Sequence, residues 1–263
     1  MTSNGRIGAA QPATPLLEVS NLTVSYQREP VLRAVSFSCP PGAVVGIIGP
    51  NGAGKSTLIK AVLGLVPRES GEVRVGGLPV DRARDRIAYV PQREDVDWDF
   101  PVTALDVVLM GRYRQVGLFR RPGPRDRALA LELLERVGLE GFAQARIGQL
   151  SGGQQQRVFV ARALAQEADL FFLDEPFVGV DAATERIILE LMAQLRRAGR
   201  TIVMVNHDLG VVQDHCDLVL LLNGAVVAFG PPGEVFRPDL LRRTYGGRLV
   251  AFEQGGSRVV VGP

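Results

Sequence analysis

The chain has 263 residues, 46% of them hydrophobic and 22% charged, a composition typical of a folded globular protein and not of a disordered one. Lysine and arginine total 30 and aspartate and glutamate 28, which gives a formal net charge of +2. This charge lacks the large basic excess of proteins that bind nucleic acid through its phosphates, so we expect no nucleic-acid partner.

No apolar run approaches the roughly 18–20 residues that a membrane-spanning helix requires. The longest, residues 218–230, is interrupted by Asn223 and Gly224. Residues 1–15 contain no apolar block like that of a secretory signal, and we expect them to form a flexible lead-in. We therefore expect a soluble, intracellular protein.

Cysteine and lysine each occur only twice. The two cysteines, Cys39 and Cys216, lie far apart and in no spacing typical of a metal site, so we expect buried free thiols in a reducing compartment. Lys55 and Lys60 are the two lysines, and every other basic residue is an arginine. Each lysine therefore merits inspection.

Residues 16–39 alternate apolar and polar side chains, with turn signals between the runs. A period of two is typical of strands with one solvated face, and predicts an N-terminal antiparallel β layer. Four later runs are almost wholly apolar, which is typical of central strands in a parallel sheet. These runs are Val44–Ile48, Leu170–Leu173, Ile202–Val205 and Leu218–Leu222.

Helical patterns follow these strands. We expect a helix over Lys55–Leu65, after a glycine-rich turn, and another over Ala182–Arg197, where apolar residues recur every four positions. Strands that alternate with helices of this length predict an α/β core with a mostly parallel sheet.

Between residues 94 and 166 the helical signals dominate. Leu129, Leu133, Leu134 and Val137 share one helix face, and Gly138 is suited to end that helix. The pattern predicts one domain over residues 16–245, with a helical subdomain inserted at about 94–166. A glycine-rich, poorly patterned tail follows at 246–263.

The strongest motif follows the strand expected at residues 44–48. It matches G-x-x-x-x-G-K-[ST] and consists of Gly49, Pro50, Asn51, Gly52, Ala53, Gly54, Lys55, Ser56 and Thr57. Its glycines let backbone N–H groups converge on phosphate oxygens at a helix N-terminus. Lys55 would reach the β- and γ-phosphates of a nucleotide, and Ser56 would bind Mg²⁺. The alternative is a glycine-rich turn with a chance lysine.

A second motif ends the apolar run at residues 170–173. Asp174 would hold Mg²⁺, directly or through water, and Glu175 would act as the general base on the attacking water. Strand ends on one edge of a parallel sheet meet the ligand crevice, so both motifs fit one site. The alternative for this pair is an ordinary helix N-cap after a buried strand.

A third motif offers another anion-binding helix N-terminus about a hundred residues after the first. It consists of Ser151, Gly152, Gly153 and Gln154, preceded by Leu150.

Together, the three motifs resemble those of the ATP-binding-cassette (ABC) ATPases, and the resemblance extends from Leu16 to about Arg243. It implies a P-loop nucleotide hydrolase core with an antiparallel layer and an inserted helical subdomain, and the use of ATP and Mg²⁺. It also implies that two copies pack head to tail. Residues 151–154 of one copy then close over ATP held by the other.

The resemblance implies roles for four further residues. Tyr26 would stack on adenine, Gln92 would sense Mg²⁺ and water, Asp181 would communicate with the partner subunit, and His207 would contact the γ-phosphate. Tyr26 also fits an ordinary strand-face tyrosine, and His207 a structural histidine. The segment 178–181 reads Val-Gly-Val-Asp, looser than the family's common Ser-x-Leu-Asp.

Residues 90–112 and 174–185 are similar to the ATPases of manganese, zinc and iron importers. The resemblance implies an ATPase that energises a divalent-metal importer, with manganese ahead of zinc and iron. Its partners would be integral membrane permease subunits, which meet such ATPases after Gln92, and indirectly an extracytoplasmic solute-binding protein. The chain would then lie on the cytoplasmic face of the cell membrane.

Three other interpretations stay open. The chain could energise another import class such as that of iron-siderophores, which the co-purifying membrane subunit would decide. It could be a soluble ABC ATPase of DNA repair or translation, although it lacks their usual long insertion or second cassette. It could also be a regulatory nucleotide-binding module, which a phosphate-release assay would separate from an ATPase.

Two acidic segments imitate metal sites. Residues 95–99 begin like a calcium loop, but Phe100 and Asp106 stand where glycine and glutamate are required. Residues 214–217 read Asp-His-Cys-Asp, and such sequence neighbours rarely converge on one ion. We interpret both as solvated surface.

Overall fold

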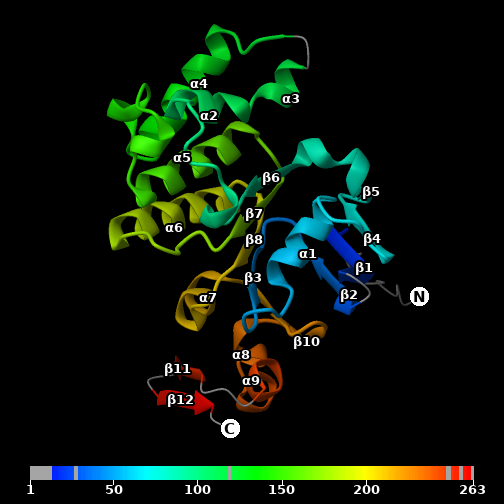
Figure 1. Cartoon of the computed structure of the whole chain (residues 1–263). Helices are drawn as coiled ribbons and strands as arrows, with labels where there is room; N and C mark the ends of the chain where they lie inside the picture. Colours follow the sequence, from blue (N-terminus) through cyan, green and yellow to red (C-terminus); the bar gives the residue numbers. More distant parts are fainter. Residues whose placement is uncertain (1–13, 27–28, 118–119, 247–249, 255–256, 262–263) are drawn as a thin grey trace, which may run out of the picture.

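The computed structural model describes residues 14–26, 29–117 and 120–246, and the backbone of residues 250–254 and 257–261. In these ranges the chain forms two large sheets, a group of helices and a small C-terminal hairpin (Figure 1). Most of the expected lead-in, residues 1–13, lies outside the described residues. None of the helices in the described ranges has the length and hydropathy of a membrane span.

The first sheet is antiparallel, with strand order β2-β1-β4-β5. Strands β1 (Leu17–Tyr26) and β2 (Glu29–Cys39) confirm the predicted N-terminal layer. Leu17 faces both Cys39 on β2 and Val75 on β4, which fixes the register. Strands β4 (Ser70–Val75) and β5 (Leu78–Pro79) were not predicted.

The second sheet is mostly parallel, with strand order β10-β9-β3-β8-β7-β6. Only the edge strand β10 runs antiparallel to its neighbour. The four apolar runs are confirmed as strands of this sheet. Its strands are β3 (Val44–Ile48), β6 (Ile87–Val90), β7 (Leu170–Asp174), β8 (Thr201–Val205), β9 (Leu218–Leu222) and β10 (Val226–Gly230).

Alternate residues of the parallel strands enter two separate apolar cores. Val45 and Ile47 pack with the antiparallel sheet and α1, whereas Val44 and Ile48 pack with helices on the opposite face. Burial on both faces explains why these strands are apolar throughout. The helices are α1 (Lys55–Val62), α2 (Ala104–Met110), α3 (Tyr113–Val116), α4 (Pro124–Arg136), α5 (Gly152–Ala165), α6 (Ala182–Arg197), α7 (Leu209–His215), α8 (Pro232–Val235) and α9 (Pro238–Tyr245).

Helix α1 ends three residues before the predicted Leu65. Gly64 has φ +71°, a left-handed conformation that glycine adopts without strain. The N–H of Leu65 donates to the carbonyl of Lys60 at 2.8 Å, and the N–H of Gly64 to that of Ala61 at 3.1 Å. This pair of bonds is the Schellman motif, which terminates helices, so the predicted extension was wrong.

Helices α2 to α5 fall within the range predicted as helical. The face of α4 is confirmed, because Leu133, Leu134 and Val137 are buried and Leu129 is partly buried. The 3₁₀ turns in the described ranges are η1 (Val80–Arg82), η2 (Arg84–Arg86), η3 (Arg93–Asp95), η4 (Glu140–Phe142) and η5 (Ile147–Gln149). The bounds of the domain, 16–245, and of the inserted helical subdomain, about 94–166, stay predictions.

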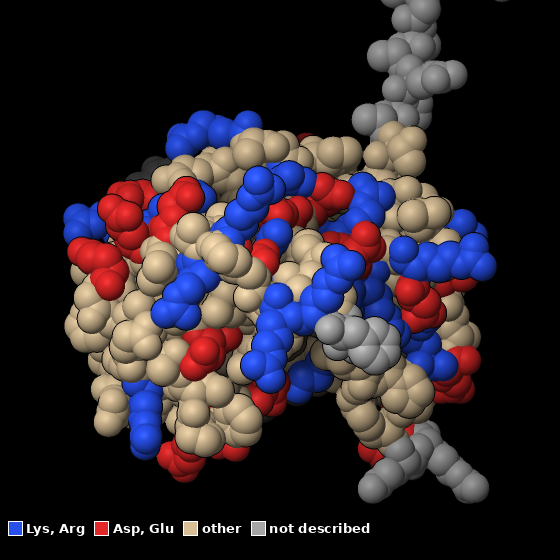
Figure 2. Space-filling view, turned by 90° about the horizontal axis from the view of Figure 1, so that it is seen from above, with Lys and Arg blue, Asp and Glu red and all other residues tan. Residues whose placement is uncertain are grey.

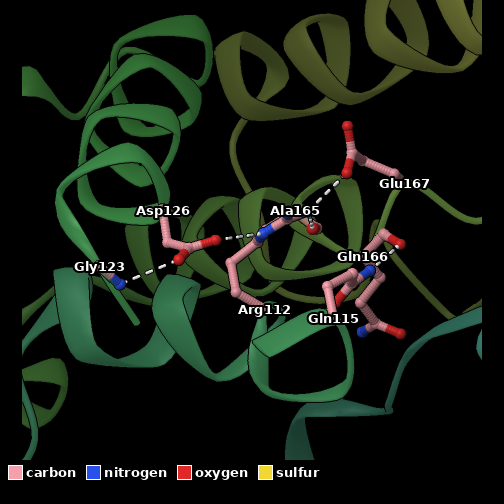
Figure 3. A network of polar contacts seen from close by, with 7 residues as sticks. All are labelled: Arg112, Gln115, Gly123, Asp126, Ala165, Gln166 and Glu167. Atoms are coloured by element: carbon pink, nitrogen blue, oxygen red, sulfur yellow. Dashed lines mark hydrogen bonds and ion pairs between the residues drawn. The ribbon is translucent and has the colours of Figure 1, made fainter. Parts of the chain in front are cut away.

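A polar network joins the end of α5 to α3 and α4 (Figure 3). The guanidinium of Arg112 donates to Asp126 at 3.0 Å, to the carbonyl of Ala165 at 2.8 Å and to Glu167 at 2.6 Å. Gln115 donates to the carbonyl of Gln166 at 2.7 Å. Because α5 leads directly into β7, the network anchors the helices to the strand that ends in Asp174.

The C-terminal region holds more regular structure than its sequence indicates. Strands β11 (Val250–Gln254) and β12 (Ser257–Val261) pair as an antiparallel hairpin in the predicted tail.

Cys39 and Cys216 are confirmed as buried free thiols, and burial raises the pKa of each to about 12.

Candidate active site

A cavity of about 540 Å³ lies where the parallel strands end. The segments after β3, β8, β7 and β6 meet there, because these strands are consecutive neighbours in the sheet. The cavity is lined by Tyr26, Val31, Asn51, Gly52, Ala53, Gly54, Lys55, Ser56, Thr57, Gln92, Glu175 and His207. All of these except Val31 were predicted site residues. Val31 is an apolar strand residue, so no sequence signal singled it out.

The glycine-rich loop connects β3 to α1, as the motif requires. Gly49 and Pro50 follow the strand, and α1 begins at Lys55 with no side chain capping its first turn. An uncapped helix N-terminus beside a cavity presents free N–H groups and a favourable dipole to an anion.

Lys55 is only 6% exposed although it carries a charge. Its Nζ donates to the carbonyls of Gly49 at 2.8 Å and Pro50 at 3.0 Å. Burial lowers the pKa of Lys55, and the charges of Glu175 and Asp174 oppose this effect. The ammonium is therefore held inside the loop that surrounds the expected phosphate position.

Asp174 ends β7 and is fully buried. Its Oδ1 accepts a hydrogen bond from Ser56 Oγ at 3.4 Å, whereas its Oδ2 has no hydrogen-bond partner in the described chain. Burial raises the pKa of Asp174 to about 6; the Ser56 hydrogen bond opposes the shift and the Glu175 charge adds to it. Tyr89, which was not predicted, has a pKa raised by burial and then by Asp174.

The raised pKa of Asp174 predicts a stability effect. In the folded chain the Asp174 carboxyl stays protonated up to about pH 6, whereas in the unfolded chain it loses its proton near the ordinary pKa of 3.8. The free energy of unfolding should therefore fall as the pH rises from 3.8 to about 6. Asp174→Asn should remove that slope and raise the free energy of unfolding at pH 7.5 by about 1–2 kcal/mol.

Denaturant titration in a chelating buffer without nucleotide tests this expectation. Asp169→Asn is the contrasting control, because Asp169 forms ion pairs with Arg86 and Arg200 that the substitution would weaken. A less stable Asp174→Asn chain at pH 7.5 would contradict the prediction.

Glu175 sits between two of the other predicted residues. Its Oε2 accepts a hydrogen bond from Gln92 Nε2 at 3.0 Å, and its Oε1 lies 2.5 Å from His207 Nε2. The three residues follow β7, β6 and β8, and Glu175 has φ +52°, an uncommon conformation for a residue with a side chain. The next helix, α6, begins at Ala182 and is capped by Asp181, so the pair 174–175 does not cap a helix and the N-cap alternative is wrong.

Tyr26 is the last residue of β1 and lies at the cavity, with 45% of its surface exposed. An exposed ring at the edge of the cavity is compatible with stacking on a base.

The remaining predicted residues lie outside this cavity. Ser151 caps α5 by accepting from the N–H of Gln154 at 3.3 Å, and Gln154 Oε1 accepts from the N–H of Ser151 at 2.8 Å. Gly152 and Gly153 form the first turn of that helix. Asp181 caps α6 by accepting from the N–H of Thr184 at 2.7 Å. Within one chain, these residues do not share the cavity of the glycine-rich loop.

The two acidic segments have structural contacts. Asp95 forms an ion pair with Lys60 at 2.8 Å. Asp217 accepts from the N–H of Val44 at 2.9 Å and pairs with Arg196. Asp95 and Asp217 therefore have structural partners within the chain.

Comparison with known proteins agrees with this geometry. Residues 32–178 match the family described as ABC transporter. The chain belongs to the ABC transporter family. As an ABC ATPase, it binds and hydrolyses ATP, which confirms the resemblance that the motifs indicate.

Individual relatives of this ABC ATPase cover nearly its whole length. It is 55% identical to the manganese transport system ATP-binding protein MntB of Bacillus subtilis (strain 168), over 89% of this chain and 93% of that protein. It is 54% identical to the zinc transport system ATP-binding protein TroB of Treponema pallidum (strain Nichols), over 89% and 88%. A solved ATP-binding subunit of an ABC transporter is 30% identical, with a TM-score of 0.74 over 88% of this chain and 93% of that one.

Proposed function

We propose that this chain is the ATP-hydrolysing subunit of an importer for a divalent transition metal, with manganese ahead of zinc and iron. The observation that carries this proposal is the identity of 54–55% to proteins named for manganese and zinc transport, across 89% of the chain. The transported metal is the cargo of the assembled transporter, and the ATPase site acts on ATP.

Ser56, Asp174 and Gln92 are the residues that would hold Mg²⁺ beside ATP. Hydroxyl, carboxylate and amide oxygens are ligands that suit this ion. The unpartnered, fully buried Oδ2 of Asp174 fits that role, because a buried carboxylate oxygen without a partner is costly unless a cation or donor meets it. Bound Mg²⁺ would neutralise negative charge on the β- and γ-phosphate oxygens.

Individual residues of the chain would have separate roles in ATP hydrolysis. Lys55 would exchange its two loop carbonyls for phosphate oxygens and stabilise the charge that develops on them. Glu175 Oε would accept a proton from the attacking water, and Gln92 and His207 would hold this carboxylate in place. His207 would also contact the γ-phosphate, and Tyr26 would stack on adenine.

A second copy of the chain would complete each ATP site. The motif at residues 151–154 lies outside the cavity of its own chain, and Ser151 at the start of α5 is exposed. An exposed helix N-terminus suits the phosphates of ATP held by another copy. Asp181, exposed at the start of α6, would lie near the same interface.

The other partners would be integral membrane permease subunits, and through them an extracytoplasmic solute-binding protein, with the chain on the cytoplasmic face of the membrane. The segment after Gln92 would meet the permease. Figure 2 shows acidic side chains among the basic ones on one face of the molecule, a mixed surface that suits a protein partner better than nucleic acid.

The multi-element content of cells that lack this gene tests the function. Complementation with the wild type should restore one transition metal, with manganese expected, whereas Glu175→Gln should not restore it. Unchanged content of every metal in the deletion strain would contradict the import of a metal. A change confined to iron would fit both a divalent-iron importer and the iron-siderophore class, and the co-purifying membrane subunit would decide between them.

A further inference from the structure

The short turn after Gln92, η3 (Arg93–Asp95), touches three separate parts of the molecule. Gln92 at its start reaches Glu175. Arg93 reaches the first turns of α5, and Asp95 reaches α1. The turn is therefore the place where the hydrolytic site, the phosphate-loop helix and the helix of residues 151–154 are joined.

Arg93 contacts α5 at the residues that follow Ser151. Its Nη2 donates to Gln155 Oε1 at 3.2 Å, and Gln155 is buried and held by the carbonyl of Ile147 at 3.1 Å. A Cβ added to Gly152 would lie 3.1 Å from Arg93 Cζ. The guanidinium therefore lies close to the backbone of Gly152, and even a methyl group at this position would require it to shift slightly.

Two further contacts keep Arg93 in this place. The indole N–H of Trp98 donates to the carbonyl of Arg93 at 2.9 Å, and the Trp98 ring packs edge-on against Phe159 of α5 at 5.2 Å between centroids. On the other side of the turn, the Lys60–Asp95 ion pair fastens it to α1. Arg93 is thus held between α1 and α5 by contacts at both ends of its segment.

We infer that Arg93 is a positioning residue for the motif at residues 151–154. Its guanidinium fixes the first turn of α5 relative to Gln92. Gln92 contacts Glu175 in the ATP site of its own chain, whereas residues 151–154 enter the ATP site of the second copy. The contact of Gln92 with Glu175 in one site is therefore linked to the orientation of the motif in the other site. The inference rests on the proposed function, because it requires two copies that share their ATP sites.

Arg93→Ala tests the inference in the purified full-length chain. The variant should bind a fluorescent ATP analogue as tightly as the wild type at concentrations where the chain is monomeric. Its maximal rate of phosphate release should fall about tenfold or more, and the dependence of rate on ATP should lose its cooperativity. Arg93→Lys should restore part of the rate, because lysine keeps the charge and one donor but not the planar fork.

Two arginine variants serve as controls. Arg127→Ala removes an exposed guanidinium from α4 and should match the wild type in every assay. Arg112→Ala breaks the network at the other end of α5 and should lower the melting temperature while the dependence of rate on ATP keeps its cooperativity. Arg93→Ala should leave the melting temperature within a few degrees of the wild type.

A normal, cooperative rate in Arg93→Ala would overturn the inference, and so would loss of ATP binding by the monomer, which would indicate general damage. If Arg112→Ala and Arg93→Ala change cooperativity equally, Arg93 has no special position and the inference is also wrong. If the wild type itself releases no phosphate, the proposed function fails first and the inference fails with it.

Discussion

Glu175→Gln is expected to lower the maximal rate of ATP hydrolysis by roughly 10²–10⁴-fold, the usual contribution of a positioned general base. Glutamine keeps the length of the side chain and can still accept from Gln92 and face His207, so the arrangement around Oε1 and Oε2 should persist. The variant loses the carboxylate that, under the proposed function, would take the proton of the attacking water.

Phosphate release at saturating ATP measures this change. Two parallel readouts show that the site is otherwise intact: ATP affinity, and ATP-driven dimerisation followed by size-exclusion chromatography, should both survive in Glu175→Gln. Hydrolysis at the wild-type rate would exclude Glu175 as the base.

Lys55→Ala is expected to weaken ATP binding about 10- to 100-fold and to remove hydrolysis at cellular ATP concentrations. The range corresponds to about 1.5–3 kcal/mol, the contribution of a hydrogen bond to a charged group. The variant loses the only ammonium that lines the cavity in the described chain. Titration with a fluorescent ATP analogue measures the affinity.

The other lysine provides the matched control. Lys60→Ala removes an ammonium from the same helix, but its partner is Asp95 and it does not line the cavity. The control should keep its ATP affinity within about twofold, because it loses only a half-exposed ion pair. Tight ATP binding by Lys55→Ala would count against the role of the glycine-rich loop.

The strands that could be predicted from the sequence have a clear pattern, either regular alternation as in β1 or apolar residues throughout as in β3. Residues 44–48 are apolar at every position because both faces of β3 are covered, and a short run of this kind is typical of a central strand. Strand β4, in contrast, buries only Val73 and Val75, and its remaining residues are polar or glycine. A half-exposed strand of this kind has too weak a pattern to be found without its neighbours.

The order of the strands in the sheet could not be predicted from local sequence patterns. Strand β3 pairs with β8 and β9, which no periodicity indicates. The contacts of Glu175 with Gln92 and His207 depend on this order, so the sequence could nominate the three residues but not their hydrogen bonds. The end of α1, in contrast, could have been predicted, because Gly64 is a helix stop signal. The apolar pattern that continues to Leu65 led to the longer prediction.

The site residues also differ in whether the sequence alone could identify them. A motif with a physical mechanism marks the glycine-rich loop, whereas Val31 and Tyr89 carry no such mark and matter only through where the chain brings them. Ser151 and Asp181 have visible helix-capping roles within one chain. Their proposed work with a second copy is absent from the geometry of a single chain.

The position of β3 between β8 and β9 also bears on how this protein is made. A ribosome releases residues 44–57 early, but the two strands that flank β3 are completed only when residues 201–205 and 218–222 emerge. Until then an entirely apolar strand has both hydrogen-bonding edges open, a state prone to aggregation. We therefore expect the nucleotide loop to take shape late in synthesis, and nascent chains that stall before residue 201 to depend on chaperones.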